Sequence, residues 1–465
     1  MDRGTVMALV AMSLGVFLIA NDFTALSVAI PEIESDLETT LAKAQWVING
    51  YAVVFGVLIV TGGRLADLFG RKRIFMIGAT IFGVFSVLGG IAPSIELVIV
   101  CRAFMGIGGA MVWPSVLGMT YAILPEEKAG LAGGLILGVA GMGNAIGPLL
   151  GGVLTDTLSW RWVFFLNVPI TVFAMVVIHL QVAETQGDSA ERRIDYRGIA
   201  TLSAGVVAIL IALDQGTETG FGDPTILALF GIGVVLLVLF AVIELRQGEG
   251  ALVPRSVLEN REFVAACVAV LAMSAIFFSA LLYLPQFMEK ELGFSPIEAG
   301  AGLLPLMVVF AITSFVAGPL YDRLGARLVV GAGAICLGVG ILVLSFLDDG
   351  SSYASLVPGM VILGLGVGLF YSSITTAGVT ALDPSQTSLA GGIVYMCQVA
   401  GGSVGLGLNT AIVLSASGLS EGIRIAFRVD AVLALIGLLI VLRYIGTSEP
   451  ATHRLQLRGH HRAHA

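Results

Sequence analysis

The stretch GRLADLFGRKR, residues 63–73, decides the fold of this chain because it recurs. A second stretch, GPLYDRLGAR at residues 318–327, begins 255 residues later and shares the pattern G-x-L-x-D-x-x-G-x-(Lys/Arg). Both stretches join two apolar segments that are long enough to cross a bilayer. A tight basic turn repeated at matching positions indicates that the chain consists of two halves with one fold.

The composition predicts an integral membrane protein made of helices. Of the 465 residues, 57% are hydrophobic and 12% are charged, whereas a soluble domain has about 25% charged residues. The apolar runs are continuous and roughly 20 residues long, which is the length of a helix across a bilayer. The four cysteines fall inside these runs and are interpreted as small core residues. The sequence shows no metal-ligand spacing, no cofactor motif and no basic run for nucleic acid.

We predict fourteen membrane segments from these runs. Their approximate spans are 5–30, 46–62, 74–92, 96–121, 130–154, 161–183, 197–214, 224–245, 263–287, 298–320, 328–347, 354–381, 388–414 and 427–446. With the N-terminus inside, 18 of the 24 Lys and Arg residues fall on the inner side and five on the outer side. Cytoplasmic loops carry such an excess of positive charge, so both termini are predicted to be cytoplasmic.

The position of the repeat divides the chain. Gly63 follows the second segment and Gly318 follows the tenth, so the repeat unit has six helices and two extra helices lie between the halves. The predicted architecture is therefore all-α, with two six-helix bundles and two intercalated helices. Its parts are an N-terminal bundle at 1–183, the two linker helices within 184–262, a C-terminal bundle at 263–446 and a cytoplasmic tail at 447–465.

The repeated turn is predicted to act in gating. Gly63 and Gly70 allow close backbone approach and positive φ in a short turn. Asp67 can cap a helix start or pair with a basic residue across the halves. A plain topology anchor is the alternative, but the copy keeps the glycines and the aspartate as well as the charge. The predicted gating residues are Gly63, Asp67, Gly70, Arg71, Lys72, Asp322 and Arg327.

Asp22 is the one acid that lies well inside a predicted segment. A charged aspartate at mid-membrane costs about 2.5–3.5 kcal/mol, so we expect it to face the interior of the bundle. Counted at 1.5 Å per residue, Asp22 lies roughly 13 Å and Arg102 roughly 9 Å below the same outer boundary. We interpret the two residues as a pair that couples transport to protons. A structural, hydrogen-bonded aspartate and a snorkelling arginine are the alternatives.

The second half has no acid that the predicted spans place deep in the membrane. Asp430 falls near the start of the last span, 427–446, and is predicted to lie close to the outer interface. Four histidines follow the last span and are interpreted as part of a solvated tail rather than a metal site. A strongly dicationic substrate would therefore have few counter-charges.

A glycine face is predicted on the fifth segment. Gly143, Gly147 and Gly151 recur every four residues, so they share one side of the helix and allow tight contact with a neighbour. Pro148 removes a backbone hydrogen bond and bends the helix. We expect this bent, smooth helix at the interface of the two halves, where it would help them rock and would seal the outer mouth. Gly152 completes the motif.

Substrate contacts are predicted from aromatic and polar residues near the middle of the segments. Binding sites for lipophilic cations use aromatic surfaces and few fixed polar groups. The candidates are Trp46, Asn49, Phe277, Tyr371, Tyr395 and Gln398. For each of them, contact with lipid or packing in the core is the alternative.

These motifs resemble those of a known family. The stretch at 63–73 resembles the signature between helices two and three of the major facilitator superfamily, with Leu68 in place of the usual arginine. Three further stretches, DFTALSVAIP at 22–31, GNAIGPLLGG at 143–152 and WRWVFFLNVP at 160–169, resemble its fourteen-helix drug:proton antiporter branch. The resemblance implies proton-driven export of lipophilic, often cationic compounds, and a part in proton coupling for Arg102.

The sequence thus predicts a multi-pass transporter of the plasma membrane and not an enzyme. Its expected partners are a small-molecule substrate, protons and membrane lipid, and a monomer is expected. A symporter that imports a metabolite and a lipid transporter such as a flippase are the rivals with the same fold. The antiport pattern around Pro148 argues against the symporter, and the two extra helices leave the lipid transporter open.

Overall fold

A computed structural model describes residues 3–184, 195–220, 222–247, 251–348 and 350–446. Within these ranges every regular element is a helix. The predicted cytoplasmic tail and most of the loop between the sixth and seventh segments lie outside the described residues.

Fourteen long helices and several short ones are found in the described part of the chain. The first six long helices are α1 (Arg3–Asp36), α2 (Leu41–Phe69), α3 (Arg71–Gly90), α4 (Ile95–Ile123), α5 (Ala129–Thr157) and α6 (Arg161–Gln181). Two more follow, α7 (Tyr196–Thr219) and α8 (Pro224–Gln247). The last six are α10 (Arg261–Lys290), α12 (Leu304–Leu324), α13 (Ala326–Leu344), α14 (Tyr353–Thr380), α15 (Thr387–Ser415) and α16 (Leu419–Tyr444). Short helices are η1 (Glu126–Lys128), α9 (Arg255–Glu259), α11 (Pro296–Gly302) and η3 (Pro384–Gln386).

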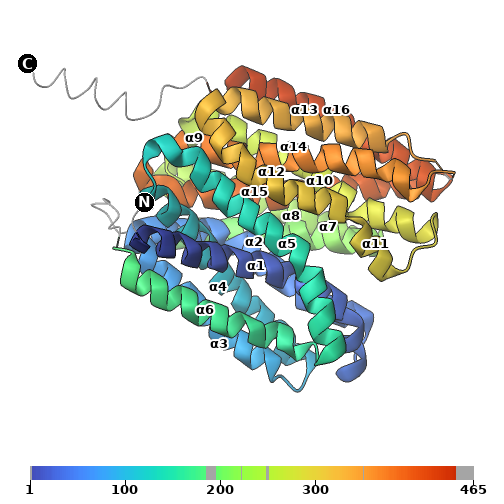
Figure 1. Ribbon diagram of the computed structural model, residues 1–465, viewed down its shortest axis with the longest axis horizontal. Coiled ribbons are helices and arrows are strands. Elements are labelled where there is room, and N and C mark those ends of the chain that lie inside the picture. Colours follow the sequence, from blue (N-terminus) through green and yellow to red (C-terminus); the bar gives the residue numbers. More distant parts are fainter. Residues whose placement is uncertain (1–2, 185–194, 221, 248–250, 349, 447–465) are drawn as a thin grey trace, which may run out of the picture.

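The long helices form two groups with a helix pair beside them (Figure 1). In the first group, α1 packs against α5 and α6, and α4 packs against α2 and α3. In the second group, α10 packs against α15 and α16, and α13 packs against α14 and α16. The helices α7 and α8 pair with each other, and α7 contacts α2 and α15. The first group contains α1–α6 and the second contains α10 and α12–α16.

Thirteen of the described helices are long and apolar enough to cross a membrane. In α7 the apolar part, Tyr196–Ala212, is shorter, so a fourteenth crossing stays a prediction. The apolar segment of α8 has only 11% of its residues buried within the protein. An apolar helix that exposes most of its surface is a helix that faces lipid.

One predicted segment is divided in the structure. The span 298–320 comprises α11 and α12, which are separated at Leu303. Pro305 lies in the first turn of α12, where a missing N–H group is tolerated. The apolar run continues across the break, so hydropathy alone does not reveal it.

The two groups touch at the ends of the helices that carry the repeated turn, which we call the loop end. Here α2 meets α15 and α5 meets α12. A Cβ atom at Gly63 would overlap the backbone of Ser388, and a Cβ atom at Gly318 would lie 2.5 Å from the carbonyl oxygen of Gly130. Each copy of the turn therefore begins with a glycine that lets a helix of the other group come close.

Candidate functional site

Asp22 of α1 and Arg102 of α4 form an ion pair, and both side chains are fully buried. Arg102 Nη1 donates to Asp22 Oδ2. This confirms the contact that the depths of the two residues predicted. In an apolar bundle each ionised group balances the charge of the other, which is what allows either of them to stay ionised there.

Three more helices hold the pair in place. Asn167 of α6 donates from Nδ2 to Asp22 Oδ1 at 2.8 Å, and the same nitrogen lies 3.1 Å from Ser86 Oγ of α3. Arg102 Nε donates to the carbonyl oxygen of Val47 in α2 at 2.8 Å. Both carboxylate oxygens of Asp22 therefore accept a hydrogen bond, and five helices of the first group meet at this one site.

An aromatic ring completes the surroundings of Arg102. Its guanidinium lies over the ring of Tyr51 at 4.3 Å from the centroid, in a cation–π contact. Within the described residues, Arg102 Nη2 has no hydrogen-bond partner. The arginine thus depends on Asp22 for its charge balance, and loss of the carboxylate charge would leave a buried cation without a counter-ion.

Asn167 was not among the residues predicted for this site. It stands in the stretch at 160–169, which resembles the antiporter branch. Asn167 is fully buried on α6. An amide inside an otherwise apolar span needs a hydrogen-bond partner in the protein, and this is the signal that could have found it.

Asp67, at the end of α2, connects the two groups of helices. Its carboxylate accepts hydrogen bonds from the backbone N–H groups of Ser388 at 3.2 Å and Leu389 at 2.8 Å, so it caps the start of α15. Arg71 donates from Nε to Asp67 at 3.1 Å and from Nη2 to the carbonyl oxygen of Pro384 at 2.6 Å. A carboxylate at a helix start pairs with free N–H groups and with the positive end of the helix dipole. We call this contact the Asp67 latch.

The second copy of the turn makes the same contact in the opposite direction. Asp322, at the end of α12, accepts hydrogen bonds from the backbone N–H groups of Gly130 at 2.7 Å and Leu131 at 3.3 Å. It therefore caps the start of α5, and we call this contact the Asp322 latch. Asp67 is buried, whereas Asp322 is exposed. Because water competes for an exposed carboxylate, the Asp322 latch is the weaker one.

The two turns differ after their second glycine. Gly70 has φ +105° and Gly325 has φ +84°, a conformation that glycine adopts without strain. Arg71 follows Gly70, but Ala326 takes the corresponding place in the copy, so the arginine contact to the other group is not repeated. Arg327 is exposed, and in the described part of the chain its side chain makes no hydrogen bond. Its gating role stays a prediction.

Lys72 acts within the first group instead of across the groups. Its Nζ donates to the carbonyl oxygens of His179 and Val182, both at 2.8 Å, at the end of α6. Its backbone N–H donates to Glu184 Oε1 at 3.2 Å. A lysine that pairs with the last carbonyl groups of a helix also balances the negative end of the helix dipole. Lys72 thus fastens the start of α3 to the end of α6.

The predicted glycine face of α5 packs against α1, within the first group. A Cβ atom at Gly143, Gly147 or Gly151 would overlap atoms of α1. Contact with the second group is made earlier along α5, between residues 130 and 141. The helix α5 does lie between the two groups, as predicted, but its glycine face does not make that contact. The reason is that a helix of 29 residues passes different neighbours along its length.

We predict that Gly151→Ala destabilises the protein and that Gly152→Ala does not. The new Cβ at 151 would overlap the backbone of Ala25, whereas the one at 152 would meet only Val28 Cγ1 at 3.7 Å. Overpacking costs about 1–3 kcal/mol, so the melting temperature of the purified Gly151→Ala protein should fall and its transport should decrease. Equal melting temperatures for the two variants would show that α1 and α5 are not tightly packed where Gly151 lies.

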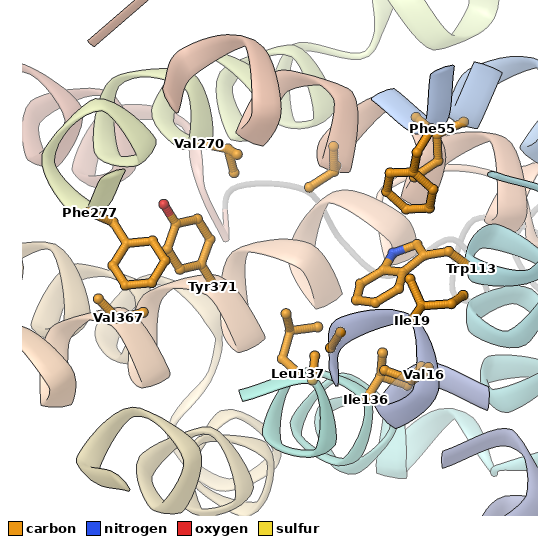
Figure 2. Packing of buried hydrophobic residues seen from close by; sticks show 14 of the residues in the cluster. Val16, Ile19, Phe55, Trp113, Ile136, Leu137, Val270, Phe277, Val367 and Tyr371 are labelled. Carbon is orange, nitrogen blue, oxygen red and sulfur yellow. The ribbon is translucent and has the colours of Figure 1, made fainter. Parts of the chain in front are cut away.

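Two aromatic clusters contain three of the predicted substrate residues. Tyr395 of α15 lies between two rings of the first group, Phe55 of α2 at 5.5 Å and Trp113 of α4 at 4.8 Å between centroids. Phe277 of α10 and Tyr371 of α14 are 6.0 Å apart. Figure 2 shows the pair Phe277 and Tyr371 on one side and Phe55 and Trp113 on the other.

The other three candidates lie elsewhere. Trp46, Asn49 and Gln398 are half-buried, and among the described residues they belong to neither aromatic cluster. Phe55 and Trp113 were not predicted. They belong to long apolar runs, so their position between the groups becomes visible only once the helices are packed.

Known proteins resemble this chain along most of its length. A family model described as Major Facilitator Superfamily matches residues 12–281 and 263–464. The puromycin resistance protein pur8 of Streptomyces alboniger is 31% identical over 400 residues, which is 85% of this chain and 79% of that protein. The multidrug resistance protein Stp of Mycobacterium tuberculosis is 31% identical over 421 residues, which is 90% of this chain and 78% of that protein. A crystal structure of the human organic anion transporter MFSD10 has the same fold, with a TM-score of 0.69 at 13% identity, covering 95% of this chain and 100% of that one.

The chain belongs to the major facilitator superfamily. It is a multi-pass transporter of the plasma membrane and not an enzyme, and the curated relatives above are named as drug or antibiotic resistance proteins. The family that the motifs resemble and the all-helical fold predicted from the composition are thereby confirmed. Transport of small molecules follows from the family.

Proposed function

We propose that this transporter exports small lipophilic compounds in exchange for protons. The observation that supports this most strongly is the buried ion pair of Asp22 and Arg102. A proton that reaches Asp22 removes the negative charge, and Arg102 then stays buried without a counter-ion, which is strongly unfavourable. Binding of one proton therefore changes the preferred packing of α1 and α4.

The latches connect this change to the two groups of helices. We propose that the groups rock as units and that the loop end is cytoplasmic, as the charge distribution predicts. In the conformation described here, Asp67 and Asp322 hold the cytoplasmic ends together. Protonation of Asp22 favours one conformation and the substrate favours the other. The proton and the substrate thus stabilise opposite conformations. The flow of protons inward therefore drives the substrate outward.

The aromatic clusters support a lipophilic substrate. Tyr395 contacts rings of the first group, so a compound bound beside it would touch both groups. Aromatic faces bind apolar molecules and also attract cations. The relatives whose names include puromycin and multidrug resistance suggest compounds of this kind. One chain contains both groups, so we propose a monomer as the working unit, with lipid around it.

Transport by inside-out vesicles tests the proposal. We expect that vesicles with the protein accumulate one or more compounds from a panel of dyes, antibiotics and labelled lipids, and that a proton uncoupler stops the accumulation. Addition of the compound to vesicles that are acid inside should release protons, because the two move in opposite directions. Protons that move together with the compound would indicate a symporter, and transport of labelled lipid alone would indicate a lipid transporter.

A further inference from the structure

Asp430 of α16 is a second fully buried acid. The expectation that it lies near the outer interface is wrong. The helix begins at Leu419, eight residues before the predicted start, so Asp430 lies eleven residues after its first residue and fourteen before its last. At 1.5 Å per residue this is about 16 Å from the nearer end. The charged residues Arg424 and Arg428 interrupt the apolar run, but the helix continues through them.

Polar side chains of two neighbouring helices surround the carboxyl group. Asn409 of α15 is also fully buried, and its Nδ2 lies 3.1 Å from each carboxylate oxygen of Asp430. The hydroxyl group of Ser279 in α10 lies beside the carboxyl group. One turn further along α10, the hydroxyl of Tyr283 shares a hydrogen bond of 2.8 Å with Thr410.

Asp430 has no cationic partner in the described part of the chain. The helices packed against α16 are α10, α13 and α15. Their titratable groups away from the helix ends are Cys267, Tyr283, Cys336, Tyr395 and Cys397, and none of these carries a positive charge. The charged residues of α10 and α13 stand at the helix ends, namely Arg261, Glu262, Glu289, Lys290 and Arg327. On α16 itself, Arg428 is exposed and Glu421, Arg424 and Arg443 lie closer to the ends.

The contrast with Asp22 decides the protonation state. Asp22 is balanced by Arg102, whereas the side chains found beside Asp430 within the described ranges are neutral. An isolated carboxylate in an apolar interior is so unfavourable that the group takes up a proton. The resulting O–H group needs an acceptor, and the hydroxyl oxygen of Ser279 lies beside it. Ser279 Oγ is buried and, among the described residues, has no hydrogen-bond partner.

We propose that Asp430 is a second proton-binding site, in the half of the transporter that does not contain Asp22. It is protonated in the conformation described here and releases its proton in the opposite conformation. Asn409 and Ser279 are positioning residues, because the amide of Asn409 donates to the carboxyl group and the hydroxyl oxygen of Ser279 can accept its hydrogen bond. The inference rests on the proton-driven export proposed above, to which Asp430 would add one proton per transported molecule.

Chemical labelling of the wild-type protein tests the protonation state directly. Dicyclohexylcarbodiimide reacts with protonated carboxyl groups in apolar surroundings, and peptide mass spectrometry then locates the adduct. We expect an adduct on Asp430 and none on Asp36, which forms an ion pair with Arg161. A protein without an adduct on Asp430, at a pH where other carboxyl groups of the protein react, would overturn the proposal.

The proton count tests the role in transport. In proteoliposomes at zero membrane potential, each proton per substrate allows one pH unit to support about a tenfold substrate gradient. Asp430→Asn should therefore lower the gradient that one pH unit sustains about tenfold, and Glu421→Gln on the same helix should leave it unchanged. An unchanged gradient in Asp430→Asn would overturn the proposal. If that variant does not fold, the labelling result decides.

The two proposals can fail separately. If a pH gradient drives no transport by the wild-type protein, proton-driven export is wrong, whatever the labelling of Asp430 shows. If the wild type is driven by a pH gradient and Asp430→Asn sustains the same substrate gradient, only the second proton site is wrong.

Discussion

Asp22→Asn is expected to abolish proton-driven export and to leave a folded protein in the membrane. The amide has nearly the same size as the carboxylate and can accept the hydrogen bond from Asn167, but it cannot take up or release a proton. Substrate uptake driven by a pH gradient into proteoliposomes should fall to the level of empty liposomes. Undiminished uptake by this variant would refute the coupling role of Asp22.

The stability of the same variant reports on the ion pair. Asp22→Asn leaves the charge of Arg102 buried and unpaired, and removal of one partner of a buried pair costs about 3–5 kcal/mol. The double variant Asp22→Asn/Arg102→Gln removes both charges. It should melt at a higher temperature than either single variant and still show no proton-driven export. If the double variant melts no higher than the two single ones, the charges of Asp22 and Arg102 do not stabilise each other.

A surface pair provides the matched control. Lys43 and Glu96 form an ion pair at 3.1 Å, and both side chains are mostly exposed. Solvent screens such a pair, so Glu96→Gln should change neither the melting temperature nor transport. A loss of transport in this control would mean that general changes in charge, and not the buried pair, explain the Asp22 result.

Asp67→Ala is expected to shift the protein toward the conformation with separated cytoplasmic ends. The substitution removes the cap of α15 and the ion pair with Arg71. Hydrogen bonds to a charged group contribute about 2 kcal/mol, which corresponds to roughly 30-fold in the equilibrium between two conformations. Spin labels at Lys128 and Arg323, in a chain whose four native cysteines are replaced, should report a longer distance. Transport should become slower because the conformation with joined cytoplasmic ends is no longer favoured.

Asp322→Ala is the comparison for this experiment. It removes the corresponding cap of α5, but Asp322 is exposed and, in the described part of the chain, forms no ion pair with an arginine of its own loop. Solvent screening reduces the free energy that such a contact contributes. The distance between the labels should therefore change less than in Asp67→Ala. A larger change in Asp322→Ala would contradict the order of strength that we assign to the latches.

Several contacts of the site could be predicted from the sequence alone. The depth of Asp22 and Arg102 in their segments predicted the ion pair, because a helix has a fixed rise per residue. Of the two options for Asp67, the helix cap is found, whereas its basic partner is Arg71 of the same loop and not a residue of the other half. For Gly70, the expected positive φ is found at 105°. These predictions succeed because they depend on distances along one helix or on the local geometry of a turn.

Other features depend on which helices become neighbours. The sequence did not reveal that Asn167 binds Asp22, that the glycine face of α5 packs against α1, or that Tyr395 meets Trp113. Each of these contacts joins helices whose rotation and tilt are set by the whole bundle. Apolar side chains on all sides of a membrane helix leave little periodicity from which its inner face could be read.

The amino-acid sequence by itself determined that the chain is helical, spans a membrane and contains two related halves. The bilayer sets the length of the apolar segments, and local backbone geometry sets the residues of the repeated turn. Both can therefore be recognised in the sequence. Only the tertiary structure decided that Asp430 is fully buried and that, among the described residues, no cationic side chain pairs with it. The reason is that the charge balance of a buried acid is set by side chains from other helices, which packing alone brings within reach.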